Sequence, residues 1–199
     1  MTLPIYELKI SENLQDEAQV DYIALVDAPA IKKDFLAFNE DQKKIMFSII
    51  SEEKRIISGA LMLADELIYR NNEKMGEHYV KFSADTIKAI AIKFAKKKYQ
   101  NNVNLMHDPS QKVKGVTMFE SWLVDTERGI MPMKGFEGVA NGSWFGSFYV
   151  ENEKVWQSIK KGDYKGFSVE GLFDYVEPIS AEENALKKIE ELLNSIIEE

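Results

Sequence analysis

The sequence contains no cysteine and only two histidines. Without thiols there can be no disulfide scaffold, no cysteine nucleophile and no zinc–thiolate site. Two histidines are too few for a multi-histidine metal centre, so we expect neither a metal ion nor a cofactor. An enzyme of this composition must therefore use serine, threonine, histidine, carboxylate, lysine or tyrosine side chains.

Long hydrophobic runs are also missing. No stretch approaches the ~18 apolar residues of a membrane-spanning helix, and residues 1–4 lack the basic and apolar regions of a signal peptide. The apolar fraction of 45% and the charged fraction of 29% are ordinary for a globular protein. We therefore expect a soluble cytoplasmic protein with no membrane partner.

Positive charge is scarce, with 25 lysines and arginines against 33 acidic residues and a net charge of -8. This balance argues against nucleic acid as a partner. Much of the excess lies in residues 177–199, which hold seven acidic residues and two lysines. Residues 180–183, Ser-Ala-Glu-Glu, form a capping box that starts a helix. We expect residues 1–178 to form one domain and residues 179–199 an acidic helical tail.

Strand patterns dominate the rest of the chain. Residues 44–50 are one predicted strand. A helix over residues 42–50 is the alternative for this segment, because the same apolar residues also fit a 3.6-residue period. Alternating or β-branched apolar residues predict strands over residues 5–10, 20–26, 44–50, 55–63, 77–82, 103–107, 113–124, 143–150 and 166–176.

Two helices are expected within the domain. Ser83 is a suitable N-cap for a helix that runs to about Lys98, and Asn152 for a shorter helix that ends at Gly162. Strands and helices do not alternate strictly, so a doubly wound parallel sheet is not expected. The pattern favours the α+β or mainly β class, with a largely antiparallel barrel or curled sheet and helices packed outside.

His107 and Ser168 are the first two candidates for catalysis. We expect His107 at the end of a strand that faces a loop, from which it could reach a serine on a neighbouring strand. Ser168 lies between two glycines in Gly-Phe-Ser-Val-Glu-Gly, residues 166–171, and shares one strand face with Glu170. This is not the Gly-x-Ser-x-Gly elbow, because the spacing after the serine is one residue too long. The other histidine, His78, has polar sequence neighbours and no special setting.

Glu120 is the third candidate, because it interrupts a strongly apolar strand. A buried carboxylate needs a partner, and His107 could be that partner, with the carboxylate fixing the imidazole tautomer. The alternative is a solvated carboxylate on an exposed strand face.

Several short motifs follow one another in a fixed order. Together they resemble the phage head-maturation (prohead) serine proteases, most closely the protease of PBSX-like prophages. The motifs are residues 22–30, 58–62, 68–70, 79–83, 104–108, 120–122, 142–144 and 165–171.

The resemblance implies a fold like that of herpesvirus assemblin, an antiparallel β-barrel of about seven strands with surrounding helices. In that family a histidine precedes the serine, and His107 and Ser168 match these positions. Ser168 would attack a peptide carbonyl while His107 carries the proton. For the third member we favour Glu120 and place Glu170 second.

The resemblance also implies a biological setting. The chain would be a serine endopeptidase that acts in the host cytoplasm, inside the assembling procapsid, on scaffold and major capsid protein, and we expect a homo-oligomer. The acidic tail fits the start of a scaffold-like segment. One alternative is an inactive protease-fold head component that binds capsid or portal proteins. Another is an unrelated β-rich enzyme or binding module that uses the loop at residues 129–142.

Overall fold

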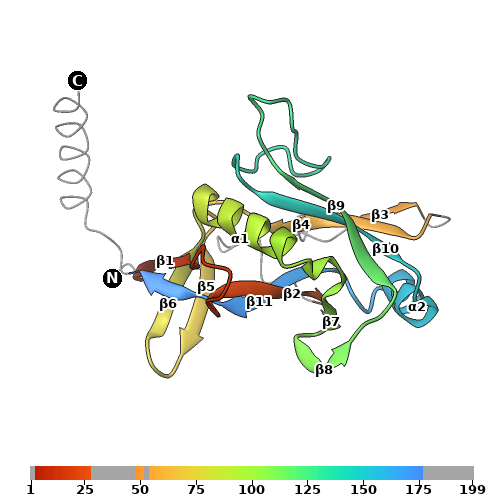
Figure 1. Ribbon diagram of the computed structural model, residues 1–199, viewed down its shortest axis with the longest axis horizontal. Coiled ribbons are helices and arrows are strands. Elements are labelled where there is room, and N and C mark those ends of the chain that lie inside the picture. Colours follow the sequence, from red (N-terminus) through yellow and green to blue (C-terminus); the bar gives the residue numbers. More distant parts are fainter. Residues whose placement is uncertain (1–2, 28–47, 52–53, 177–199) are drawn as a thin grey trace, which may run out of the picture.

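The computed structural model of the chain describes residues 3–27, 48–51 and 54–176. This part forms three four-stranded sheets, two α-helices and one 3₁₀ turn (Figure 1). The strand orders are β12-β1-β6-β5, β3-β4-β10-β9 and β11-β2-β7-β8. In chain order the elements are β1 (Ile5–Lys9), β2 (Gln19–Val26), β3 (Ser48–Ser51), β4 (Ile56–Met62), β5 (Ile68–Asn72), β6 (Gly76–Lys81), α1 (Ala84–Lys96), η1 (Tyr99–Asn101), β7 (Val103–Leu105), β8 (Asp108–Lys112), β9 (Val116–Leu123), β10 (Trp144–Val150), α2 (Glu153–Lys161), β11 (Gly166–Leu172) and β12 (Asp174–Val176).

Both expected helices of the domain are present with their expected caps. The Ser83 side chain accepts the backbone N–H of Thr86 at the start of α1. Asn152 caps α2 in the same way by accepting the N–H of Val155. Gly162 ends α2 with φ at 81°, a left-handed conformation that glycine adopts without steric cost. Local sequence therefore determines where these two helices begin and where α2 ends.

Strands predicted over residues 44–50 and 55–63 correspond to β3 and β4, which form an antiparallel pair. Residues 48–51 are a strand, so the alternative of a helix through them is wrong. β5 was not predicted, because its sequence Ile-Tyr-Arg-Asn-Asn is short and mostly polar. It pairs with β6 as an antiparallel hairpin. Residues 42–47 and the predicted tail at 179–199 lie outside the described residues.

The third sheet, β11-β2-β7-β8, is organised around β2. This strand pairs antiparallel with β11 and parallel with β7. Residues 23–26 of β2 are buried, as the unbroken apolar run at these positions predicts. α1 packs against β2, and the ring of Phe167 on β11 lies 4.6 Å from that of Phe148 on β10. β2 therefore fixes how far β11 stands from β7.

The predicted α+β or mainly β class is confirmed, but the predicted barrel is not. β11 lies close to β4, yet within the described residues no ladder of hydrogen bonds joins these two strands. The three sheets therefore curve around a shared core without closing into one continuous cylinder. The core contains large side chains from several strands, among them Trp144, Phe148 and Phe167.

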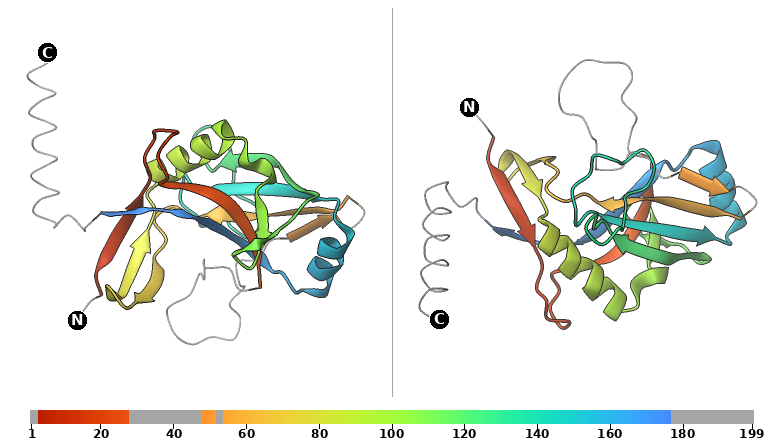
Figure 2. Two further views of the ribbon diagram at one scale, coloured as in Figure 1. Left: turned by 60° about the horizontal axis from the view of Figure 1, so that its bottom comes forward. Right: turned by 90° about the horizontal axis from the view of Figure 1, so that it is seen from above.

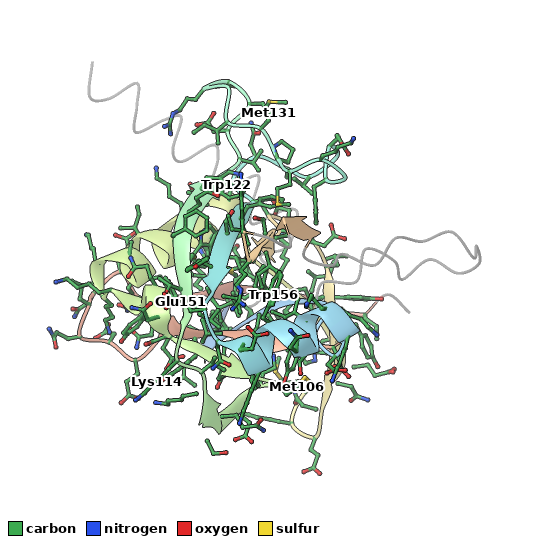
Figure 3. All side chains as sticks on the ribbon, turned by 90° about the vertical axis from the view of Figure 1, so that its right-hand side faces the viewer. Met106, Lys114, Trp122, Met131, Glu151 and Trp156 are labelled. Atoms are coloured by element: carbon green, nitrogen blue, oxygen red, sulfur yellow. The ribbon has the colours of Figure 1, made fainter. Side chains whose placement is uncertain are left out.

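The elements are spread along one long axis. β1, β5 and β6 lie at one end and α2 at the other, and α1 lies between them (Figures 1 and 2). The long loop between β9 and β10 carries Met131 away from the body, on the side opposite to Met106 in the β7–β8 turn (Figures 1 and 3). The loop at residues 129–142 is the binding element in the alternative of an unrelated β-rich module. It is remote from the β7–β8 turn (Figure 3).

Candidate active site

Ser168 lies in the middle of β11, directly opposite Ala24 of β2. Its neighbour Phe167 points into the core and is 2% exposed, whereas Ser168 is 8% exposed and lines a cavity of about 420 Å³. The Ser168 hydroxyl forms no hydrogen bond with another group in the described part of the chain. It is therefore available to a ligand in the cavity.

A β-bulge follows Ser168 on the same strand. The pairing of β11 with β2 shifts between Glu170 and Gly171. A Cβ atom on Gly171 would lie 2.0 Å from the backbone oxygen of Gln19, which is far inside van der Waals contact. Glycine is required here because the two backbones approach so closely. The bulge in turn sets the course of the strand just after Glu170.

We expected His107 at the end of a strand. The structure places it instead at the tip of the β7–β8 hairpin. Leu105 pairs with Asp108 across the turn, and the two residues between them, Met106 and His107, have φ angles of 53° and 58°. Two successive positive φ angles are typical of the type I′ turn that joins tightly twisted strands. Histidine tolerates this conformation better than most side chains, so the turn itself positions the imidazole.

Asp108 stabilises this turn from the other side. Its carboxylate accepts the N–H and the hydroxyl of Ser110 and the side-chain amide of Gln111. These hydrogen bonds, that of Gln111 first, lower the pKa of Asp108 below the ordinary value for an aspartate. The charged form of Asp108 therefore favours the conformation that presents His107.

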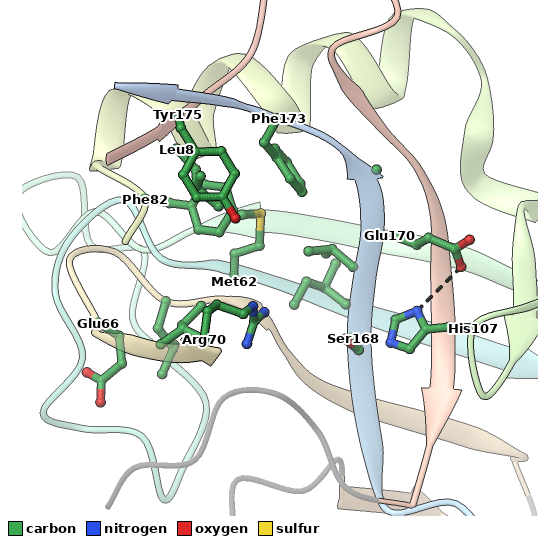
Figure 4. Close-up of a pocket in the computed structure, with 15 residues that line it drawn as sticks. Leu8, Met62, Glu66, Arg70, Phe82, His107, Ser168, Glu170, Phe173 and Tyr175 are labelled. Carbon is green, nitrogen blue, oxygen red and sulfur yellow. Dashed lines mark hydrogen bonds and ion pairs between the residues drawn. The ribbon is translucent and has the colours of Figure 1, made fainter. Parts of the chain in front are cut away.

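Glu170 is the carboxylate at His107. Its Oε2 atom lies 3.4 Å from His107 Nδ1 and accepts a 2.6 Å hydrogen bond from the side-chain amide of Asn104 (Figure 4). A carboxylate only accepts hydrogen bonds, so in this contact Nδ1 carries the proton. Nε2 of the neutral ring is then a free acceptor. The contact thus selects the tautomer that a general base requires.

Asn104 supports this contact from β7 and is 1% exposed. Ala24 pairs with Ser168 on one side and with Asn104 on the other, so these three residues form one row across the sheet. Asn104 therefore holds the Glu170 side chain over the row that contains Ser168. Asn104 was not considered as a site residue, although a lone asparagine in an apolar strand that leads into a histidine is a usable signal.

The Glu170 carboxylate also affects a second acidic side chain, that of Asp21 on the neighbouring strand β2. Partial burial raises the pKa of Asp21 on β2, and the charge of Glu170 raises it further. Lys112 has the opposite effect on Asp21. The electrostatic influence of the Glu170 carboxylate therefore reaches Asp21 on β2.

The structure brings Ser168, His107 and Glu170 to one cavity, and Figure 4 shows the imidazole beside Ser168. Within the described structure no hydrogen bond joins the Ser168 hydroxyl to the ring. Such bonds are often long or unformed in the absence of substrate.

The predicted contact between Glu120 and His107 is not made. Glu120 lies on β9 opposite Ser147 of β10, in a different sheet, with its side chain exposed. The solvated alternative for this residue is correct, because the Glu120 side chain is exposed. Its place at His107 is taken by Glu170, the residue considered second.

The other histidine is buried in the β12-β1-β6-β5 sheet. His78 is fully buried, and its Nδ1 atom lies 2.9 Å from the carbonyl oxygen of Gly76. Its ring makes edge contacts with Tyr6 and Tyr175, and its Nε2 atom has no hydrogen-bond partner among the residues that the structure describes. These contacts give His78 a packing role that its polar sequence neighbours did not indicate.

Within the ranges that the structure describes, no cluster of histidine and carboxylate side chains could hold a metal ion. No helix among those residues is both long enough and apolar enough to span a bilayer.

A hydroxyl, an imidazole and a carboxylate around one cavity are the groups that serine hydrolases combine. The family comparison agrees with this class. A family model described as "Putative phage serine protease XkdF" matches residues 46–177, which is more than half of the chain and includes all three groups. The chain belongs to this phage serine protease family. No curated protein and no solved structure matches it.

Proposed function

We propose that the protein is a serine endopeptidase of phage head maturation, with Ser168 as nucleophile, His107 as general base and acid, and Glu170 as the carboxylate that orients His107. One observation carries this proposal: the three side chains line the same cavity, and the Glu170 carboxylate contacts His107 at Nδ1. The membership of a phage serine protease family supports the same reaction class.

The mechanism uses Nε2 of His107, because the contact with Glu170 occupies Nδ1 and leaves Nε2 free to accept a proton. His107 Nε2 takes the proton from the Ser168 hydroxyl as the oxygen bonds to the peptide carbonyl carbon. Glu170 stabilises the imidazolium that forms. The tetrahedral intermediate collapses when the carbon–nitrogen bond breaks and Nε2 returns its proton to the leaving amine. Water then attacks the acyl ester by the same route and releases the second product and the free serine.

We further propose that the substrates are the scaffold and the major capsid protein, cleaved inside the procapsid in the host cytoplasm. Oligomers of the chain would be incorporated with their substrates, and the acidic segment at residues 179–199 would serve as a scaffold-like contact. The support for this setting is the phage family alone. The chemical argument for the reaction rests instead on the groups that line the cavity, so the two parts of the proposal are tested separately.

The reaction is tested with a fluorophosphonate probe, which reacts with an activated serine and needs no knowledge of the substrate. The wild-type protein should be labelled at Ser168, and Ser168→Ala and His107→Ala should not. Ser147, a buried serine hydrogen-bonded to Ser58, offers the matched control Ser147→Ala, which should still be labelled. Labelling that persists in Ser168→Ala would overturn the nucleophile assignment.

The setting is tested by co-expression with the capsid protein encoded by the same phage genome. Wild type should shorten the capsid or scaffold protein, and Ser168→Ala should leave both at full length. A folded wild-type protein that binds capsid protein, but is neither labelled nor able to cleave, would instead be the inactive head component.

A further inference from the structure

The cavity at Ser168 continues well past the serine, toward β1, β5 and β12. This far part, which we call the distal pocket, is lined by side chains that are mostly apolar. Arg70 on β5 also lines it, with Tyr175 of β12 close by (Figure 4). The apolar members are Leu8, Met62, Ile68, Phe82 and Phe173. A substrate that reaches Ser168 can therefore extend into a pocket with apolar walls and one cationic side chain.

Arg70 has no carboxylate partner in the described part of the chain. Among these residues its only hydrogen bond runs from Nη1 to the backbone oxygen of Tyr69, at 3.0 Å. Glu66 also lines the pocket, but its carboxylate points away from the guanidinium in Figure 4. A guanidinium has five N–H donors, so the described residues use only a small part of its hydrogen-bonding capacity.

Arg70 is exposed on β5, and its guanidinium borders the cavity among the neighbouring side chains. Desolvation by the neighbouring side chains lowers the pKa of Arg70, and interaction with Tyr175 acts in the opposite direction. The group remains a cation at any physiological pH. An incoming carboxylate could bind the guanidinium with two parallel hydrogen bonds.

We infer that Arg70 binds a carboxylate of the peptide substrate, so that the enzyme selects peptides with a glutamate or aspartate side chain near the scissile bond. This inference rests on the proposed function, because it assigns the substrate class of that same site. A terminal carboxylate has the same chemistry. We assign a side chain, because the protein is proposed to cut within long chains. The apolar walls would hold the methylene groups of the acidic residue or an apolar neighbour.

The test begins with a library of peptides whose C-termini are amidated, so that every carboxylate in it is a side chain. Mass spectrometry of the products should show an acidic residue enriched at one position relative to the cut. Matched peptides with glutamate, glutamine or lysine at that position then give kcat/KM values. We expect wild type to prefer glutamate over glutamine by about tenfold or more, the scale of one charge-assisted hydrogen bond.

Two variants of Arg70 and one control make the result specific. Arg70→Gln should bring the glutamate-to-glutamine ratio close to one, and Arg70→Glu should shift the preference toward the lysine peptide. Arg128 is an exposed arginine on the β9–β10 loop that pairs with Asp125 at 3.6 Å, and Arg128→Gln should keep the wild-type preference. Fluorophosphonate labelling of Ser168 should proceed equally in all four proteins, because the probe carries no acidic side chain.

Each result decides between the two proposals. If Ser168 is labelled but wild type shows no acidic preference, or Arg70→Gln keeps it, the inference about Arg70 is wrong and the proposed function stands. If only peptides with a free C-terminus are cleaved, the carboxylate is terminal and the side-chain assignment is wrong. If wild type is neither labelled nor active on any peptide, the proposed function fails and the inference fails with it.

Discussion

The Glu170 carboxylate lies 3.4 Å from Nδ1 of His107, although Glu170 is on β11, His107 is in the β7–β8 turn and the two residues are 63 positions apart in sequence. The contact depends on β2, which separates the strand of Glu170 from the hairpin of His107. It depends also on Asn104, which holds the same carboxylate oxygen at 2.6 Å. This relationship gives the most direct tests of the site.

Glu170→Gln should reduce kcat/KM by about 10²–10⁴-fold without unfolding the protein. Glutamine keeps the shape of the side chain, but it does not stabilise the imidazolium and can select the wrong tautomer. Glu120→Gln is the matched control, since Glu120 is exposed on β9, and it should keep wild-type activity. Peptide cleavage and fluorophosphonate labelling rates measure both. If Glu120→Gln lost activity and Glu170→Gln kept it, Glu120 would be the functional partner of His107.

Asn104→Ala should slow labelling of Ser168 and also lower stability. It removes a hydrogen bond to a charged acceptor, worth about 1.5–3 kcal/mol, and it frees the Glu170 side chain to move away from His107. The loss of activity should appear mainly in kcat, because Asn104 is 1% exposed and does not line the substrate cavity. A variant with unchanged kcat and a raised KM would contradict a positioning role.

Gly171→Ala should destabilise the domain strongly. The new methyl group would lie 2.0 Å from the Gln19 backbone oxygen, so β11 must move away from β2. Gly129 has a positive φ angle of 76° and open space around it, so Gly129→Ala should cost only about 1–3 kcal/mol of backbone strain. Thermal unfolding compares the two variants. An equal or smaller drop in Tm for Gly171→Ala would show that the bulge is not as closely packed as described.

Lys93 provides a test of the fold away from the site. Its buried ammonium group donates to the carbonyl oxygens of Ser11, Asp16 and Ala18 at 2.8, 3.2 and 3.0 Å. Lys93→Met should destabilise the protein by about 1–3 kcal/mol, because these acceptors lose their donor. Lys88 is exposed on the same helix, so Lys88→Met should change Tm very little. Urea unfolding of both variants measures the difference in stability. Similar urea midpoints for Lys93→Met and Lys88→Met would show that the Lys93 hydrogen bonds do not stabilise the fold.

Low pH should loosen the β7–β8 hairpin before the rest of the domain. The folded hairpin lowers the pKa of Asp108, so it stabilises the charged form. This contribution is fully present above the ordinary aspartate pKa of 3.8 and is lost as the pH falls through the lower folded value. The amide of Ser110, which donates to Asp108, should then lose protection in hydrogen exchange. In Asp108→Asn the protection should be independent of pH over this range, and a retained pH dependence would point to another group.

Some of this site was accessible from sequence, and some was not. Local patterns predict the caps of α1 and α2 and the strand around Ser168, because each depends on residues a few positions apart. The resemblance to prohead proteases pointed to Ser168 and His107. It did not identify the carboxylate, because the Glu170–His107 contact is set by the pairing of β11, β2 and β7. Period-2 alternation places Glu120 and Glu170 equally well on strands. Only sheet membership distinguishes them.

The local conformation at His107 also could not be predicted from the sequence. Its sequence neighbours predicted a strand that ends at the histidine, whereas a turn with two left-handed residues begins one position earlier. Turns of this kind usually carry glycine or asparagine, and Met106-His107 contains neither. Arg70 was missed because the strand that carries it is short and polar, and no sequence feature indicated that the strand borders the Ser168 cavity.

The order of strands in the β11-β2-β7-β8 sheet also bears on how the protein can be divided. The family match begins at residue 46, but β2 ends at Val26 and is the strand that joins β11 to β7. A fragment trimmed to the family match would contain the nucleophile, the base and the carboxylate and yet lack the connection between them. The serine strand and the histidine hairpin would then each expose an unpaired edge to solvent. The smallest unit that can hold this site together is therefore larger than the segment by which its family is recognised.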